Sequence, residues 1–218
     1  LLPAQDHKRV GDGDTGPNTG GMGAYTPLDW APVDLVDEIM TQVARPTIAE
    51  MARRGTPFSG VLYCGLALTS NGLRVVEFNA RFGDPEIQAV LRLMESPLSD
   101  LLLAAADGRL GDVPPPTWAS GSAVCVVIAA HGYPGDVIGG DPVSGIERAD
   151  NVEGVSVVHA GTRDQDGTLV TAGGRVLSVT AVGDDLAQAL KRAYQGVALV
   201  DLRGGHHRTD IGSRAGPA

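Results

Sequence analysis

The most informative run in the chain is Glu77-Phe78-Asn79-Ala80-Arg81-Phe82-Gly83-Asp84-Pro85-Glu86. Its first residues end an apolar run that predicts a strand. Its last three are typical of a helix start, with Asp84 as the N-cap, Pro85 in the first helical position and Glu86 near the positive end of the helix dipole. Side chains alternate across a strand, so we expect Glu77 and Asn79 on one face. A carboxylate and an amide oxygen placed in this way can share one hard cation.

This run has two interpretations. Magnesium prefers oxygen ligands and commonly completes its shell with water and nucleotide phosphates, and the planar guanidinium of Arg81 suits bidentate contact with a phosphate or acyl-phosphate oxygen. The simpler interpretation is a strand end with a solvated Glu, an Asn in a turn and a surface Arg. Glu-x-Asn alone favours the simpler interpretation, whereas the full run, closed by Asp-Pro-Glu, favours Mg²⁺ (or Mn²⁺) at Glu77 and Asn79.

Around this strand, apolar periodicity predicts a hairpin and several helices. The hairpin pairs residues 61–69 with 73–79 through the turn Ser70-Asn71-Gly72. We expect Asp34 to cap the first helix and Pro46 to kink or divide it, because proline removes a backbone donor and clashes with the preceding turn. The helices are expected at 33–54, from Asp84 onward and near 98–106.

Residues 111–118 contain three consecutive prolines, which favour stiff, extended backbone and mark the expected domain boundary. Residues 1–110 are expected to form a partial domain that holds the substrate and metal site, and residues 119–218 a small mixed domain. In the second domain we expect strands and one helix capped by Asp184-Asp185, which makes the whole chain α+β. These strands are expected at 123–130, 155–159, 168–172, 175–182 and 197–202.

A second motif is the glycine-rich segment from Asp14 to Gly23, which shows little periodicity. Glycines let backbone N–H groups approach an anion closely, and hydroxyl and amide side chains add fixed donors. The segment lacks the order of a Walker loop, and the alternative is a flexible loop without a ligand. Lys8, one of two lysines in the chain, precedes it and suits a phosphorylated substrate. The candidates for substrate binding in and before this segment are Lys8, Asp14, Asn18, Thr19, Gly20 and Gly21.

Composition narrows the class of protein. The net charge of −9 comes without a basic cluster, so we expect no nucleic-acid partner. No apolar run approaches the roughly 20 residues needed to cross a bilayer, so we expect no membrane partner. Cys64 and Cys125 lie in apolar runs without zinc-ligand spacing, which favours two buried thiols and, together with the absence of a signal peptide, a cytoplasmic location. The start lacks an initiator Met, so we expect a fragment of a longer protein.

Three runs together resemble the phosphoribosylamine–glycine ligase (glycinamide ribonucleotide synthetase) family of ATP-grasp enzymes. They are Pro3 to Arg9, Asp14 to Gly23 and Glu77 to Glu86. Short runs in the second half are similar to the C-terminal domain of the same family. These are Gly132-Tyr133-Pro134-Gly135, His159-Ala160-Gly161-Thr162, Gly173-Gly174-Arg175-Val176-Leu177 and Asp210-Ile211-Gly212.

The resemblance implies the C-terminal part of an ADP-forming ligase of purine biosynthesis. Its substrates would be ATP, glycine and 5-phosphoribosylamine, and its intermediate would be glycyl phosphate. By this resemblance Glu77 and Asn79 match metal-ligand positions, and Arg81 matches the catalytic position that steadies the transferred phosphoryl group. The segments 14–23 and 84–86 would shape the substrate pocket.

Two departures from the family pattern limit this expectation. The preceding strand reads Tyr63-Cys64-Gly65-Leu66, with no acidic metal ligand, and the segments that clamp adenine would precede Leu1. We therefore expect the isolated chain to be inactive and to need the missing N-terminal part as its partner. Two alternative hypotheses for the function remain open. The chain could belong to another ATP-grasp carboxylate or bicarbonate ligase, or it could be a non-catalytic fragment that keeps the fold. Whether the turn at 173–175 contacts nucleotide also stays open.

Overall fold

The computed structural model describes residues 1–213 and contains two compact units. Among the described residues, unit 1 combines Leu1–Leu28, Asp84–Leu93 and 119–213, and unit 2 combines Asp29–Gly83 with Met94–Trp118. Both units mix helices and strands, which confirms the expected α+β class. No helix within residues 1–213 is long and apolar enough to cross a membrane.

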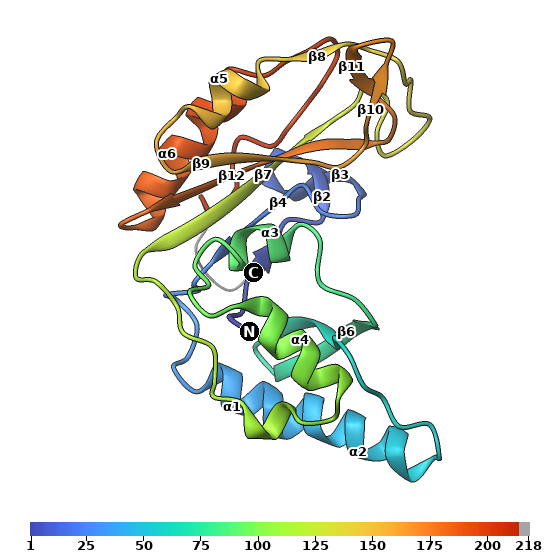
Figure 1. Ribbon diagram of the computed structural model, residues 1–218, viewed down its shortest axis with the longest axis vertical. Coiled ribbons are helices and arrows are strands. Elements are labelled where there is room, and N and C mark those ends of the chain that lie inside the picture. Colours follow the sequence, from blue (N-terminus) through green and yellow to red (C-terminus); the bar gives the residue numbers. More distant parts are fainter. Residues whose placement is uncertain (214–218) are drawn as a thin grey trace. The chain divides into compact units, whose positions relative to one another are not determined.

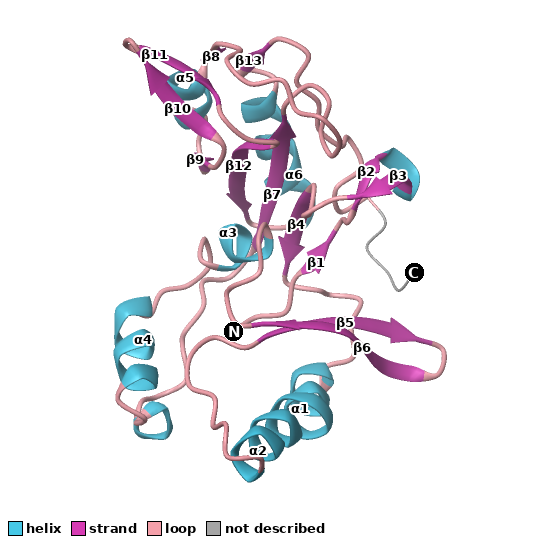
Figure 2. Ribbon diagram, turned by 90° about the vertical axis from the view of Figure 1, so that its right-hand side faces the viewer, coloured by secondary structure: helices cyan, strands magenta, loops and turns pink. Residues whose placement is uncertain are grey.

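Unit 1 is built on a five-stranded sheet in which every neighbouring pair is antiparallel (Figure 2). Every residue of its central strand is buried, because the apolar run is paired on both edges and covered on both faces. The strands in spatial order are β1 (Gln5–Asp6), β4 (Gly23–Thr26), β7 (Ser122–Ala129), β12 (Arg175–Gly183) and β9 (Val155–His159).

The main core lies between this sheet and α6 (Leu186–Val197). Val124 and Val126 of β7 belong to one buried cluster with Ala189 and Ala193 of α6. Each fully buried valine contributes about 1.5–3 kcal/mol relative to an exposed one. The carboxylate of Asp185 caps α6 by accepting from the Gln188 N–H at 2.8 Å, which confirms the predicted cap.

Smaller elements complete unit 1. Figure 1 shows α5 (Ile146–Asp150) beside α6, and α3 (Glu86–Val90) packs against β4 and β7. Three short antiparallel pairs surround the sheet. They are β2 (Arg9–Gly11) with β3 (Thr15–Asn18), joined by the 3₁₀ turn η1 (Asp12–Asp14); β10 (Thr162–Gln165) with β11 (Thr168–Thr171); and β8 (Val143–Ser144) with β13 (Asp201–Leu202).

Unit 2 contains one long interrupted helix and the predicted hairpin. The helix runs through α1 (Leu35–Ile39), the π-helical segment η2 (Met40–Ala44) and α2 (Arg45–Arg53). The wider π turn ends at Ala44, and Pro46 follows in the first turn of α2. Proline has no N–H to donate, and its ring crowds the preceding turn. The π-helical segment therefore divides the helix just before Pro46, where a kink or a division was expected.

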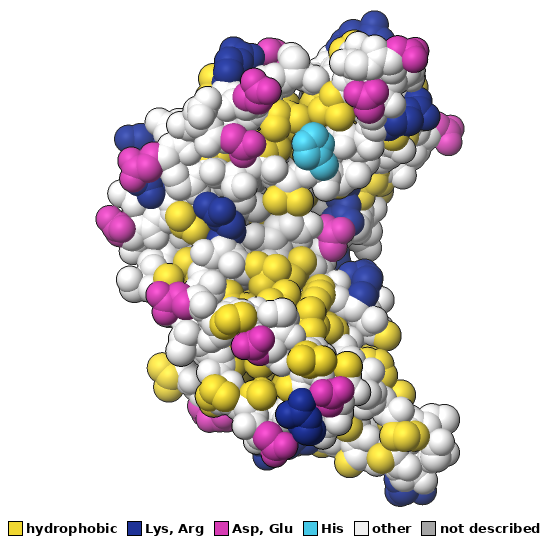
Figure 3. Space-filling model, viewed as in Figure 1, with side chains coloured by type: hydrophobic (Ala, Val, Ile, Leu, Met, Phe, Trp, Pro, Cys, Tyr) yellow, Lys and Arg dark blue, Asp and Glu magenta, His cyan; other side chains and the backbone are white. Residues whose placement is uncertain are grey.

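The hairpin of unit 2 consists of β5 (Tyr63–Thr69) and β6 (Gly72–Asn79), which confirms the predicted turn and its strands. The helix α4 (Leu98–Ala106) and the 3₁₀ turn η3 (Leu110–Asp112) follow. Leu102, Leu103 and Leu110 expose large parts of their side chains. In the space-filling view, apolar side chains gather in the lower part of the picture, and acidic and basic side chains touch near its lower edge (Figure 3).

Several expectations about elements were wrong. Asp34 sits at the N-cap position of α1 but its side chain makes no capping hydrogen bond. Asp84 is not the cap of α3, because Pro85 holds that position and the Asp84 carboxylate accepts from Arg175 and Gln88 instead. The last strand covers only Asp201–Leu202, since α6 extends to Val197.

The two compact units are interleaved along the chain, whereas the domains expected from sequence follow one another. The strands β1 and β4 come from the expected first domain, and they share one sheet with β7 of the expected second domain. The sequential division at 111–118 stays a prediction.

Candidate substrate and metal site

The predicted metal ligands lie at the end of β6 in unit 2. Glu77 faces Gly65 and Asn79 faces Tyr63 across the hairpin. The register shifts only beyond Gly65, where the pairing passes from Glu77 to Val75. The alternation from Glu77 to Asn79 is therefore regular, and the two side chains share a face.

Gly65 has a direct structural reason to lack a side chain. A Cβ atom at this position would lie 2.8 Å from Cγ of Glu77. The Glu77 side chain therefore crosses the space that a residue at 65 would fill. The absence of a side chain at Gly65, and hence of a carboxylate there, is thus coupled to the placement of Glu77.

The donor set of Glu77 and Asn79 fits a hard cation. Nδ2 of Asn79 is buried and has no hydrogen-bond partner within residues 1–213. No protein contact to that nitrogen thus fixes the amide orientation, and the amide oxygen can turn toward a ligand. No group of three or more His, Cys, Asp or Glu side chains in that part of the chain could hold a metal ion. A cation here would need water or phosphate oxygens to complete its shell.

Arg81, the predicted catalytic residue, follows two residues after Asn79 in unit 2. Its side chain is exposed, and Nη1 donates to the Phe82 carbonyl at 2.7 Å. This contact turns the guanidinium back along its own backbone. The proposed phosphoryl contact of Arg81 stays a prediction.

The glycine-rich segment in unit 1 is ordered by contacts within the chain. The Thr19 N–H and Oγ1 both donate to the Lys8 carbonyl, at 2.7 and 2.9 Å. The Gly21 N–H donates to Thr19 Oγ1 at 2.9 Å, and the Gly20 N–H donates to the Tyr133 hydroxyl at 2.9 Å. The N–H groups of these three residues therefore already have acceptors, and a ligand anion that bound them would have to displace the Lys8 carbonyl, the Tyr133 hydroxyl or Thr19 Oγ1.

Asp84 is brought to this segment by Arg175 of β12. Nη1 of Arg175 donates to the carbonyl oxygens of Gly20 at 3.2 Å and Asp84 at 2.9 Å. Nη2 donates to the Asp84 carboxylate at 3.0 Å. From sequence, residues 173–175 were expected to form a turn, with a nucleotide contact left open. The separation of 155 positions between Gly20 and Arg175 left no local signal for the contact seen here.

A buried carboxylate, Asp6, lies beneath the same segment. A Cβ atom at Gly21, where φ is +118°, would lie 2.7 Å from Oδ1 of Asp6 and 2.3 Å from Cδ of Pro85. Nζ of Lys8 is 2.9 Å from Oδ2 of Asp6. Burial raises the pKa of Asp6 to about 6, and the charge of Glu86 adds to this rise while Lys8 opposes it. Lys8 and Glu86, both predicted binding residues, thus meet at Asp6, which the sequence reasoning missed.

Asp14 is engaged by a different partner. The guanidinium of Arg208 is 1% exposed; Nη1 donates to Asp14 Oδ1 at 2.7 Å, and the other two nitrogens donate to the Asp210 carboxylate at 2.7 Å each. The Asp210 carboxylate also accepts from the Gly13 N–H at 2.8 Å. The Arg208 guanidinium holds the pKa of Asp210 well below its usual range. This network fixes the turn between β2 and β3.

The predicted site residues therefore fall into separate groups. Around Asp6 and Arg175 lie Lys8, Thr19, Gly20, Gly21, Asp84 and Glu86. Asp14 lies at Arg208, and Asn18 is exposed on β3 opposite Arg9. The metal and phosphoryl candidates Glu77, Asn79 and Arg81 belong to unit 2.

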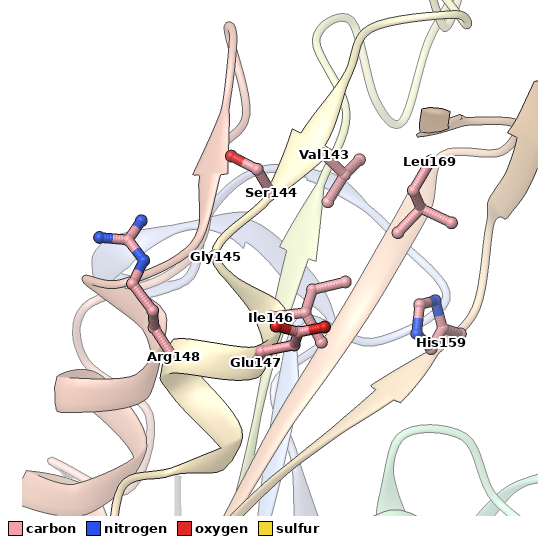
Figure 4. A pocket seen from close by; sticks show the side chains of 8 residues that line it. All are labelled: Val143, Ser144, Gly145, Ile146, Glu147, Arg148, His159 and Leu169. Carbon is pink, nitrogen blue, oxygen red and sulfur yellow. The ribbon is translucent and has the colours of Figure 1, made fainter. Parts of the chain in front are cut away.

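A depression elsewhere in unit 1 contains none of these residues. It has a volume of about 500 Å³ and lies between β8, α5 and the end of β9 (Figure 4). Its residues are Val143, Ser144, Gly145, Ile146, Glu147, Arg148, His159 and Leu169.

Comparison with known proteins assigns these groups of residues to two domains of one protein family. The family model described as "Phosphoribosylglycinamide synthetase, ATP-grasp (A) domain" matches residues 1–87, and that described as the C domain of the same synthetase matches residues 123–214. The chain belongs to the phosphoribosylglycinamide synthetase family. The A-domain match includes the glycine-rich segment and both metal candidates, and the C-domain match includes Tyr133, Arg175 and Arg208.

Relatives of this family match almost the whole chain. A phosphoribosylamine–glycine ligase of Streptomyces coelicolor is 57% identical over 100% of this chain and 53% of its own length. A crystal structure of the Thermotoga maritima phosphoribosylamine–glycine ligase has a TM-score of 0.84 and 34% identity, covering 96% of this chain and 51% of that one. The chain spans about half the length of the curated relatives it matches.

A more distant structure shares only the fold. A single-chain, multi-domain long-chain acyl-CoA carboxylase has a TM-score of 0.57 and 16% identity, covering 86% of this chain and 20% of that one. The family match and these structures agree with the expected ATP-grasp segment followed by a C-terminal domain.

Proposed function

We propose that this chain is part of an ADP-forming ligase that joins glycine to 5-phosphoribosylamine and yields glycinamide ribonucleotide. The observation that carries the proposal is 57% identity, over the whole chain, to a phosphoribosylamine–glycine ligase. Two features of the matched ATP-grasp (A) domain support it. One is the ordered glycine-rich segment, and the other is the position of the Glu77 and Asn79 side chains on one face of β6.

The proposed reaction has two steps. A carboxylate oxygen of glycine forms a bond to the γ-phosphorus of ATP while the bond to ADP breaks, which gives glycyl phosphate. The amine nitrogen of phosphoribosylamine then attacks the acyl carbon, the carbon–oxygen bond to phosphate breaks, and the nitrogen gives up one proton to water. Phosphorylation is needed because a free carboxylate is a poor electrophile.

Each candidate residue takes a role in this proposal. Glu77 and Asn79 would hold Mg²⁺ or Mn²⁺, which would offset charge on the nucleotide phosphates. Arg81 would turn from the Phe82 carbonyl to the transferred phosphoryl group. The proposed contacts for glycine and the phosphoribosyl group come from the segments that Arg175 and Arg208 order. They are Lys8, Asp14, Asn18, Thr19, Gly20, Gly21, Asp84 and Glu86.

The test is ADP release by the full-length protein that contains this chain. ADP formation should require both glycine and phosphoribosylamine, and bicarbonate should not replace glycine. ADP release with bicarbonate alone would support the second candidate, another ATP-grasp carboxylate or bicarbonate ligase, which the shared fold with the carboxylase favours. The isolated 218-residue chain should show no turnover, because we propose that the preceding part of the same protein supplies the ATP clamp.

The metal assignment has its own test. Glu77→Gln in the full-length protein should lower turnover at least tenfold, which corresponds to about 1.4 kcal/mol of barrier. An unchanged rate would rule out Glu77 as a ligand. We also propose a cytoplasmic location, supported by the free thiols of Cys64 and Cys125.

A further inference from the structure

Gly20 and Gly21 are enclosed by side chains from distant parts of unit 1. A Cβ atom at Gly20 would lie 3.0 Å from Cζ of Arg175, and one at Gly21 would lie 2.3 Å from Cδ of Pro85. Neither glycine could carry a side chain without displacing these neighbours. The two glycines therefore serve close packing against β12 and the start of α3.

Arg175 and Tyr133 fix the polar groups of the same two residues. The Arg175 guanidinium donates to the carbonyl oxygens of Gly20 and Asp84 and to the Asp84 carboxylate. The Tyr133 hydroxyl accepts from the Gly20 N–H at 2.9 Å. The N–H and the carbonyl oxygen of Gly20 are thus both bonded to side chains from the C-domain match, 113 and 155 positions away.

Backbone at the ends of β7, β9 and β12 in turn holds these two residues. A Cβ atom at Gly174 would lie 2.2 Å from Cδ2 of Tyr133, so the tyrosine ring packs where only glycine fits. The Arg175 carbonyl accepts from the Gly161 N–H at 2.8 Å, and the Gly174 carbonyl accepts from the Ala130 N–H at 2.8 Å. The Arg175 side chain is only 22% exposed, so most of its surface is buried against the rest of the chain.

We propose that Tyr133 and Arg175 are positioning residues that fix the shape of the substrate site by holding Gly20–Gly21 and Asp84 in place. This inference rests on the proposed ligase function and goes beyond it, because it gives the C-terminal part of the chain a role in the chemistry of the ATP-grasp part. Their absence would leave the segment 19–21 and Asp84 in many conformations, and binding energy would be spent on ordering them.

The experiment compares Tyr133→Phe, Arg175→Lys and Arg175→Ala in the full-length protein. Tyr133→Phe keeps the ring on Gly174 and removes only the hydroxyl acceptor. Arg163→Ala is the matched control, because Arg163 is an exposed arginine of β10 whose guanidinium donates to the side chain of Gln165, two positions away on the same strand. The two readouts are amide hydrogen exchange of residues 19–23 and the kinetic constants for glycine and phosphoribosylamine.

Arg175→Ala should speed exchange in residues 19–23 at least tenfold and lower kcat/KM at least tenfold, mainly through a higher KM. Arg175→Lys and Tyr133→Phe should show smaller changes of the same kind. Arg163→Ala should change neither hydrogen exchange nor kcat/KM. Faster exchange with unchanged kinetics would overturn the proposal, as would exchange within twofold of wild type. If Arg175→Ala fails to fold, Tyr133→Phe decides by the same criteria. A wild-type protein without ligase activity would instead refute the proposed function, while hydrogen exchange would still report on the contacts.

Discussion

At the scale of single residues, the Asp6 carboxylate is largely shielded from solvent. Its side chain is 8% exposed and its pKa rises from 3.8 to about 6. The folded protein therefore holds this proton more tightly than the unfolded chain does between about pH 4 and pH 6. Because the folded state binds more protons there, the free energy of unfolding falls as pH rises through this window. A shift of about two units corresponds to roughly 3 kcal/mol, which is an upper bound for the penalty above pH 6.

Asp6→Asn should remove this penalty. We expect the variant to be more stable than wild type at pH 7.5, by less than the full amount because the ion pair between Lys8 and the Asp6 carboxylate is lost. The difference between variant and wild type should shrink toward pH 4. Urea unfolding of both proteins at pH 4.5, 6 and 7.5 measures it. Asp136→Asn, an exposed carboxylate in the same unit, should track wild type at every pH. A difference in the free energy of unfolding between Asp6→Asn and wild type that does not vary with pH would contradict a raised pKa for Asp6.

At the scale of elements, the hairpin of β5 and β6 couples Gly65 to Glu77. Gly65→Ala should push the Glu77 side chain away from Asn79, because the added Cβ would lie 2.8 Å from Cγ of Glu77. We expect Mn²⁺ affinity in the presence of ATP to fall about tenfold in the full-length protein, as followed by calorimetry. Gly111→Ala is the control, since no atom lies within 4 Å of its added Cβ. Equal affinities for the two variants would argue against a metal site at Glu77.

The hairpin and α6 were predictable because their signals are local. The Ser70-Asn71-Gly72 turn and the Asp185 cap need only neighbouring residues. The strands β1 to β4 were missed because each has two to four residues, too few for a periodicity to appear. Arg175 and Tyr133 were missed as partners of Gly20 because only the folded sheet brings these segments together.

At the scale of the whole molecule, β7 depends on strands from both ends of the chain. It pairs with β4 on one edge and β12 on the other, and all eight of its residues are buried. Residues 119–218 alone would leave the β4 edge of this apolar strand open, and such edges promote association between chains. We expect that fragment to aggregate at concentrations where the 218-residue chain does not.

Light scattering of the two purified polypeptides at equal concentration tests this expectation. Adding a peptide of residues 1–28 should reduce association of the fragment, because the peptide contains β1 and β4. A fragment that stays dispersed and unfolds as cooperatively as the longer chain would favour the sequential domain division at 111–118.

The pairing of β4 with β7 also bears on how such enzymes can be recombined. Gly23 sits against the Cys125 carbonyl, where a Cβ atom would come within 2.6 Å, and Tyr25 pairs with Val124. A crossover placed in the proline-rich segment 111–118 would join β4 from one parent to β7 from another. Functional hybrids should therefore inherit residues 23–26 and 122–129 from the same ancestor, even though a proline-rich segment separates them in the gene.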